Sequence, residues 1–416
     1  MQLTASKPVV SATAWKPISS LPDLGGRIPE LDGLRGLAIA MILVTHYLLL
    51  IYSAPFGSPV AHLLAMGRLG WTGVDLFFVL SGFLIGGILI DARDSSSYFR
   101  VFYTRRFFRI VPIYGLFLLA NFSFLVAIHA GKAPAFSWLL RDELPWAPYA
   151  LFLQNFWMAG RNTMGVASLG LTWSLAIEEQ FYLTLPLLVR VLDPRRLLSV
   201  VVGGIVGAPL LRIALHLLWP EKLTCWFVLM PCRADALFFG VLGAIIFRKN
   251  ECRSWLESHG SLQRLFLYVL LSGVAYLTLK VSDIDGFTML AGGLTWMAVF
   301  YFSLLLYALT QKNSMVNLLL RSKWLTWLGA IAYGVYLFHA GILILISHPF
   351  WPKPLLTNKF SDLWVSVLAL FITLLVCRFS WVYFEKPLVQ LGHRVKYDIP
   401  RARNSLDLEP AMAELQ

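Results

Sequence analysis

The sequence is poor in charged residues and in cysteine. Only 14% of its 416 residues are Asp, Glu, Lys or Arg, whereas 58% are hydrophobic. Soluble domains carry about a quarter of their residues as charges, so this composition excludes a large water-soluble domain. The four cysteines form no CxxC pair and the eight histidines are scattered along the chain. These absences argue against a metal site and against redox chemistry.

Long apolar runs dominate the chain instead. A helix needs about 20 mostly apolar residues to cross a bilayer, and we predict about ten such spans. They cover residues 34–54, 72–90, 107–129, 169–191, 197–218, 225–247, 264–282, 288–310, 324–347 and 361–384. The first run contains Arg35 and His46, which makes it a poor signal peptide. We therefore predict an all-α polytopic membrane protein with tails at 1–30 and 391–416 around a membrane domain at 31–390.

The net charge of +12 could indicate nucleic acid, but the position of the basic residues argues otherwise. If both termini are cytoplasmic, nearly all basic clusters fall on the cytoplasmic side of the predicted spans. The basic residues that fall outside are Arg68, Lys132, Arg141, Arg161, Lys222, Lys280, Lys353 and Lys359. This asymmetry is typical of multi-pass membrane proteins. It predicts contacts with membrane lipid and no nucleic-acid partner.

The first span carries two ionisable residues that helix geometry places on one face. Arg35 and His46 are 11 residues apart, which returns to nearly the same face and separates them by roughly 16 Å. Ionisable groups inside a membrane are costly and mark functional sites by default. A histidine packed for structure alone is the alternative for His46, but the aligned arginine favours function.

Carboxylates lie in two further spans. The second span contains Asp75 together with small residues such as Gly82, which allow close helix approach. The fourth span places Glu178 and Glu179 near its middle. Because neighbours on a helix point about 100° apart, we expect one glutamate to face a cavity and the other a helix partner.

Basic and aromatic residues complete the set of candidates. Arg105, Arg106 and Arg109 occupy one helical turn, where guanidinium groups suit phosphate oxygens, although a membrane anchor explains them as well. Arg233 and Asp235 lie deep in the sixth span, either at a substrate cavity or in a structural network of charges. Tyr336 and His339 share a face of the ninth span. The candidates for a substrate cavity are therefore Arg233, Asp235, Tyr336 and His339.

These segments, in this order, resemble the acyltransferase family 3 membrane proteins, which are bacterial carbohydrate O-acetyltransferases. The resemblance covers about residues 28–390. The stretches that carry it are LDGLRGLAIAMILVTHY, GVDLFFVLSGFLI, RRFFRIVPIY, TWSLAIEEQFY and YGVYLFH followed by FEKP. Two mild departures are Phe338, where Trp is frequent, and Lys386, where Arg is frequent. Neither touches the first span.

The resemblance implies a cytoplasmic acyl-CoA donor, expected to be acetyl-CoA, and a carbohydrate or glycolipid acceptor across the inner membrane. It implies His46 as the catalytic histidine with Arg35 as its partner. It also implies CoA-phosphate contacts for Arg35 and the three-arginine turn; no metal is expected.

The residue types agree with acyl transfer. A neutral histidine can take the proton of a sugar hydroxyl, and a buried carboxylate, Glu178 or Asp75, could orient it. Whether His46 acts as a base or carries the acyl group stays open. A transporter or glycan exporter also uses buried His, Glu and Asp, but we find no repeat between the halves of the chain.

Overall fold

The computed structural model describes residues 28–52, 58–281, 286–348, 350 and 362–398. Every regular element in these ranges is a helix, which confirms the predicted all-α class. Most of the two predicted tails, residues 1–27 and 399–416, lies outside the described residues.

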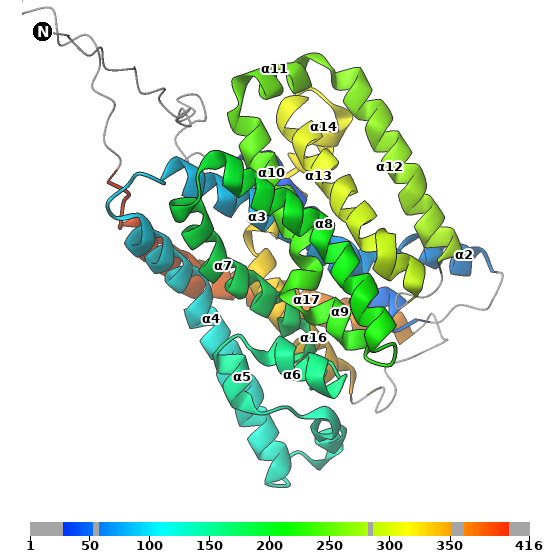
Figure 1. The fold of residues 1–416 in the computed structure, drawn as a ribbon. Coiled ribbons are helices and arrows are strands. Elements are labelled where there is room, and N and C mark those ends of the chain that lie inside the picture. Colours follow the sequence, from blue (N-terminus) through cyan, green and yellow to red (C-terminus); the bar gives the residue numbers. More distant parts are fainter. Residues whose placement is uncertain (1–27, 53–57, 282–285, 349, 351–361, 399–416) are drawn as a thin grey trace, which may run out of the picture.

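Helices follow one another along the described chain with short connections (Figure 1). In order they are α1 (Pro29–Val44), η1 (Thr45–Leu49), α2 (Pro59–Met66), η2 (Arg68–Thr72), α3 (Gly73–Asp91), α4 (Tyr98–His129), η3 (Pro134–Asp142), α5 (Trp146–Ala150), α6 (Gln154–Arg161), η4 (Gly170–Thr172), α7 (Trp173–Val191), α8 (Pro194–Leu218), α9 (Leu223–Val228), η5 (Met230–Arg233), α10 (Ala234–Arg248), α11 (Asn250–Ser258), α12 (Gly260–Lys280), η6 (Met289–Gly293), α13 (Leu294–Thr310), α14 (Met315–Leu320), α15 (Lys323–Ala330), α16 (Ala332–Ser347), α17 (Leu363–Ser380), η8 (Trp381–Glu385) and α18 (Lys386–His393).

Many of these helices can cross a membrane. Within the described residues, 8 are long and apolar enough, or 9 if α15 and α16, which meet at 75°, form one broken span. The ten spans predicted from the sequence included residues 169–191, where the structure has α7, a helix of 19 residues. Because α7 carries Glu178, Glu179 and Arg190, it is too polar to be included among these 8 helices. The multi-pass membrane class is confirmed.

The bend between α15 and α16 is accompanied by tight packing of α15 on α1. A Cβ atom on Gly36 would lie 2.0 Å from the carbonyl oxygen of Leu325, and one on Gly329 would lie 2.0 Å from that of Asp32. Only glycine permits such an approach of two backbones. This packing fixes the first turns of α1, from which Arg35 projects.

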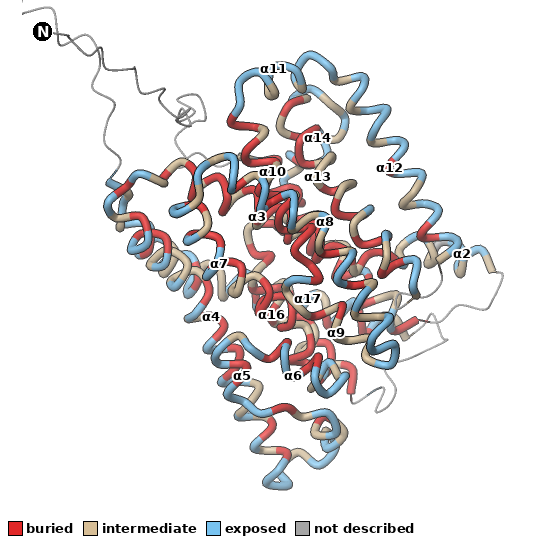
Figure 2. The backbone as a smooth tube through the Cα atoms, viewed as in Figure 1, coloured by how far each residue is buried: buried red, intermediate tan, exposed pale blue. Residues whose placement is uncertain are grey.

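Two glycines bring α3 and α10 into contact at the centre of the bundle. A Cβ atom on Gly82 would lie 1.9 Å from the Leu237 carbonyl oxygen, and one on Gly240 would lie 2.2 Å from that of Val79. The prediction that the small residues of the second span allow close helix approach is confirmed. Figure 2 shows that α3 lies in the buried interior, whereas α12 is largely exposed at the edge.

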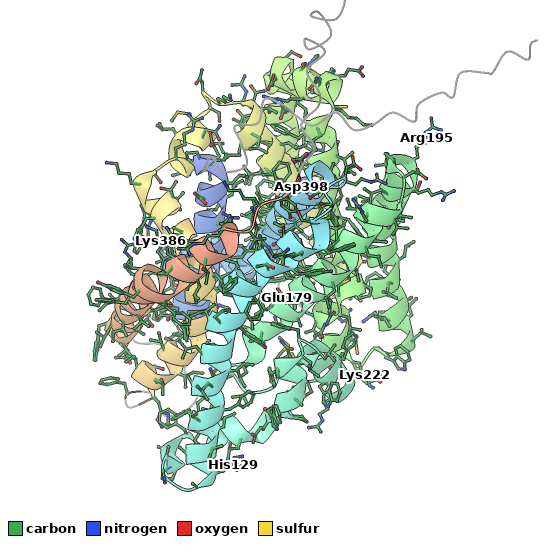
Figure 3. All side chains as sticks on the ribbon, turned by 90° about the vertical axis from the view of Figure 1, so that its left-hand side faces the viewer. His129, Glu179, Arg195, Lys222, Lys386 and Asp398 are labelled. Carbon is green, nitrogen blue, oxygen red and sulfur yellow. The ribbon has the colours of Figure 1, made fainter. Side chains whose placement is uncertain are left out.

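Residues from different parts of the chain lie at the two ends of the bundle. In Figure 3, Arg195 and Asp398 lie toward one end, Lys222 and His129 lie toward the other, and Glu179 lies between them. The helix α4 has 32 residues, about 48 Å at 1.5 Å per residue, which exceeds the roughly 30 Å of hydrocarbon. Its far end carries η3 and α5 as a lobe beyond the bundle (Figure 1).

Candidate active site

His46 lies in η1, a π-helical turn that continues α1. Its Nδ1 atom is 2.9 Å from the carbonyl oxygen of Ile42. Because a carbonyl oxygen can only accept a hydrogen bond, Nδ1 carries a proton, and in the neutral imidazole Nε2 keeps its lone pair. Short π-helical turns are frequent at functional sites. The turn therefore sets the tautomer in which Nε2 of the neutral imidazole can accept a proton.

A second imidazole, that of His339 on α16, packs against His46. The two ring centroids are 4.8 Å apart, with the rings at 77° to each other. His339 Nδ1 donates to the carbonyl oxygen of Tyr336 at 2.8 Å, and its Nε2 has no hydrogen-bond partner among the described residues. The hydroxyl of Tyr47 donates to the His339 carbonyl at 2.8 Å and ties η1 to α16. The structure therefore brings two of the predicted site residues together.

Both imidazoles line one cavity of ≈ 270 Å³, here called the histidine cavity. Its wall is mostly apolar and is made by Ile42, His46, Trp71, Val74, Met164, Ala167, Gly170, Leu171, Trp173, Phe227, Tyr336, His339 and Ala340. A neighbouring cavity of ≈ 310 Å³, here called the side cavity, shares His46, Trp71 and Phe227 with it. His46 thus stands between two spaces that can each hold part of a substrate.

A third cavity, of ≈ 130 Å³, holds cationic side chains and is here called the arginine cavity. Three of the predicted donor-binding residues, Arg35, Arg106 and Arg109, line it. Glu178 lies in the same wall, where it accepts a hydrogen bond from Ser81 at 2.8 Å. Guanidinium groups that converge on one cavity form a site for an anion such as phosphate.

Tyr336 and Val74 line both the histidine cavity and the arginine cavity. The Tyr336 hydroxyl donates to the carbonyl oxygen of Leu171 at 2.9 Å and also hydrogen-bonds to Ser174. These bonds fix the phenol to the start of α7. The two cavities therefore adjoin at a tyrosine whose position is set by its own hydrogen bonds.

Arg105 lies apart from the other two arginines of its turn. Its guanidinium donates twice to the carbonyl oxygen of Val395, at 2.9 and 3.1 Å, and it stacks on the ring of Tyr397. Arg105 does not line the arginine cavity, because neighbours on a helix point about 100° apart and its face is turned toward α18. The structure gives this arginine a contact with the C-terminal segment.

Asp75 and Arg233 form a buried ion pair with a contact of 2.5 Å. The guanidinium of Arg233 also stacks on the rings of Phe227 and Trp173, which form part of the histidine-cavity wall. Neither member of the pair lines that cavity itself, and Asp75 makes no hydrogen bond to His46. The pair lies behind the aromatic wall and holds it.

Asp235 belongs to another buried network. It pairs with Arg212 at 3.0 Å and accepts a hydrogen bond from Thr295 at 2.6 Å. Arg212 also donates to the Leu290 carbonyl, so that the network joins α8, α10 and α13. Asp235 lines none of the three cavities. Its position agrees with the alternative that it belongs to a structural network of charges.

Glu178 and His46 line different cavities. The contacts of Glu178 are the Ser81 hydroxyl and, at 3.4 Å, the Tyr182 hydroxyl. Glu178 therefore lies with the arginines rather than with the imidazole that it was predicted to orient. Among the described residues, no group of three or more His, Cys, Asp or Glu side chains could hold a metal ion.

Sequence reasoning missed Trp71, one of two tryptophans in the histidine-cavity wall. A turn of the same kind precedes α3 and α7: Thr72 donates its hydroxyl proton to the Leu69 carbonyl, and Thr172 does so to that of Leu169. The signal is the repeated LGxT before a membrane span. Each turn delivers residues to the wall of the histidine cavity.

Comparison with known proteins agrees with this geometry. A family model described as an acyltransferase domain matches residues 28–381. The chain belongs to this acyltransferase family. No solved structure matches it.

Several curated proteins are similar to this acyltransferase-family chain. It is 26% identical to the peptidoglycan O-acetyltransferase OatA of Listeria monocytogenes and 26% identical to the putative peptidoglycan O-acetyltransferase YrhL of Bacillus subtilis, each over 88% of this chain and 56% of the relative. It is 24% identical to the O-acetyltransferase OatA of Staphylococcus aureus, over 91% of this chain and 60% of the relative. The chain thus spans somewhat more than half the length of these relatives.

Proposed function

We propose that this chain is a membrane O-acyltransferase that moves an acyl group, in the simplest case acetyl, from acyl-CoA to a carbohydrate hydroxyl. The observation that carries the proposal is the adjacency of two cavities, one with paired imidazoles and one with three guanidinium groups, at Tyr336. The family membership and the O-acetyltransferase names of the relatives support the same reaction.

The donor is assigned to the arginine cavity. Coenzyme A carries phosphates at one end and a thioester at the other, and its phosphates would meet Arg35, Arg106 and Arg109. The rise of roughly 16 Å between residues 35 and 46 fits the length of the intervening arm. The thioester would then reach His46 past Tyr336, so that the donor needs no passage across the whole membrane.

The donor side is proposed to be cytoplasmic, in a cell membrane with both termini on the same side. The support is the gathering of predicted cytoplasmic residues at the arginine-cavity end, where Arg105 contacts Val395 and Ser96 contacts Asp398. Lys222, which is predicted to lie outside, lies toward the other end of the bundle (Figure 3).

His46 would act as a general base. Its Nε2 takes the proton of the acceptor hydroxyl while the hydroxyl oxygen attacks the thioester carbonyl carbon. When the carbon–sulfur bond breaks, the imidazolium returns this proton to the thiolate. The products are the acylated sugar and free CoA, and proton transfer of this kind typically contributes 10²–10⁴-fold, as an order of magnitude.

The acceptor is proposed to be a cell-surface or exported carbohydrate that reaches His46 from the side opposite the donor. Two relatives carry peptidoglycan in their names, and this makes peptidoglycan glycan the first acceptor to test. The side cavity offers a second approach to His46, away from the arginines.

The test uses the purified protein in vesicles with acetyl-CoA and soluble peptidoglycan glycan fragments. We expect release of the CoA thiol that depends on the fragments, together with acetyl esters on the fragments by mass spectrometry. Movement of a solute across the vesicle membrane without thioester cleavage would instead establish a transporter and refute the proposal.

Arg105 and Arg106 provide a matched pair of variants. Arg106→Ala should raise the KM for acetyl-CoA roughly 10- to 100-fold, because a hydrogen bond to a charged group contributes about 1.5–3 kcal/mol. Arg105→Ala should leave this KM near the wild-type value, since its guanidinium is bound to the Val395 carbonyl outside the arginine cavity. Initial rates over a range of acetyl-CoA concentrations measure both. If both variants raise the KM for acetyl-CoA equally, Arg105 also contacts the CoA phosphates.

A further inference from the structure

Trp71 lines both the histidine cavity and the side cavity. Its indole Nε1–H is buried and has no hydrogen-bond acceptor among the described residues. An indole nitrogen can only donate. A buried N–H without a protein acceptor would cost about 1–3 kcal/mol, and beside the space that His46 lines such a donor can bind an oxygen atom of a substrate.

The turn that carries Trp71 is fixed to the helix that carries His46. A Cβ atom on Gly70 would lie 2.5 Å from the hydroxyl oxygen of Thr45 and 2.9 Å from the carbonyl oxygen of Met41. The backbone of η2 therefore rests directly on the residue before His46. The Thr72 hydroxyl closes the turn on the Leu69 carbonyl at 2.6 Å. The turn that carries the indole thus packs directly on the helix that carries the imidazole.

Three other polar side chains of the histidine cavity have already used their protons, whereas the indole of Trp173 is tested separately below. His46 Nδ1 donates to the Ile42 carbonyl, and His339 Nδ1 donates to that of Tyr336. The Tyr336 hydroxyl donates to the Leu171 carbonyl. Each of these protons is directed into a helix backbone. The Trp71 indole therefore retains a donor next to the proposed base.

We infer that the Trp71 indole N–H stabilises the oxyanion formed on the thioester carbonyl, a role that rests on the proposed function. As the acceptor oxygen bonds to the carbonyl carbon, the π electron pair moves to the carbonyl oxygen and His46 takes the hydroxyl proton. As the pair returns, the carbon–sulfur bond breaks and the thiolate takes the proton from His46. A hydrogen bond to the charged oxygen is roughly twice as strong as one to a neutral carbonyl, so the indole favours the transition state.

Trp71→Phe tests this role, because it removes the N–H and keeps an aromatic ring against Phe227, whose centroid lies 5.6 Å from that of Trp71. With acetyl-CoA and peptidoglycan glycan fragments, kcat should fall on the order of 10²-fold, as for the loss of one oxyanion donor. The KM for each substrate should stay within about 3-fold, because most of the stabilisation from this hydrogen bond is gained in the transition state rather than in the bound substrate.

Trp226→Phe is the matched control. Trp226 is also buried, and its Nε1–H has no acceptor in the part of the chain that the structure describes. Its ring lies 6.1 Å from that of Phe227, yet it lines neither cavity. We expect its kcat near wild type and a thermal midpoint in detergent similar to that of Trp71→Phe. Trp173→Phe tests the other indole of the histidine cavity. We expect this variant to keep a larger fraction of the wild-type kcat than Trp71→Phe keeps.

Any of the following results would overturn the inference. They are a wild-type kcat in Trp71→Phe, an increase in KM with kcat unchanged, and an equal loss of kcat in Trp226→Phe. A larger loss in Trp173→Phe alone would give the role to that residue and equally overturn it. Failure of the wild-type protein to release CoA would refute the proposed acyltransferase reaction itself, which separates the two claims.

Discussion

His46→Ala should abolish acyl transfer while the protein stays folded in detergent. The variant removes the one nitrogen lone pair proposed to take the hydroxyl proton, and loss of such a base typically costs 10²–10⁴-fold in rate, as an order of magnitude. The substitution adds no charge and breaks one side-chain bond, that of Nδ1 to the Ile42 carbonyl. Thiol release from acetyl-CoA in the presence of glycan fragments measures the rate, and gel filtration measures the fold.

His216→Ala is the control for this experiment. His216 lies on α8, and its ring contacts Phe287 at 5.6 Å, whereas it lines none of the three cavities near His46. Its rate should match the wild type. Wild-type turnover in His46→Ala would end the proposed role of the imidazole. Retained thioester cleavage to water, with no ester on the glycan, would leave acceptor activation as its function.

Asp75→Ala should destabilise the protein strongly. The carboxylate contacts Arg233 at 2.5 Å, and the side chains of both residues are almost completely buried, at 2% and 1% exposure. Removal of one partner leaves a buried guanidinium without its counter-charge, which costs roughly 3–5 kcal/mol. A lower thermal midpoint in detergent and a lower yield of folded protein measure the effect.

The paired variant separates a structural from a catalytic role for Asp75. Replacing both partners, as in Asp75→Ala with Arg233→Met, should recover much of the lost stability, because no charge is left unpaired. Glu257→Gln is the control, since Glu257 pairs with Arg253 in an exposed contact that contributes at most about 1 kcal/mol. If Asp75→Ala instead keeps its thermal midpoint and loses kcat, the carboxylate acts in the reaction.

Features that depend on local periodicity could be predicted from the sequence. The length of the apolar runs determines the all-α membrane class, because the bilayer requires about 20 apolar residues per helix. The small residues of the second span predicted its close contact with another helix, as found at Gly82. The spacing also predicted Arg35 and His46 on one face of the first span, and in the structure each lines a cavity.

Features that depend on partners far along the chain could not be predicted. Asp75 meets Arg233 158 residues later, and no pattern in either span specifies that pairing. The three-arginine turn contained no sign that Arg105 faces the C-terminal segment, since this depends on how α18 packs on α4. Glu178 was assigned to His46 on residue type, whereas helix packing places it with Ser81.

The position of Tyr336 also matters for the ion gradients across the membrane in which the proposed reaction would take place. A continuous water-filled pore from one face to the other would let ions leak and dissipate the gradients that cells maintain. Here the Tyr336 phenol, bonded to the Leu171 carbonyl, stands where two separate cavities adjoin. In the proposed reaction, the thioester arm of one donor molecule at a time would pass this tyrosine, without a continuous water path for ions.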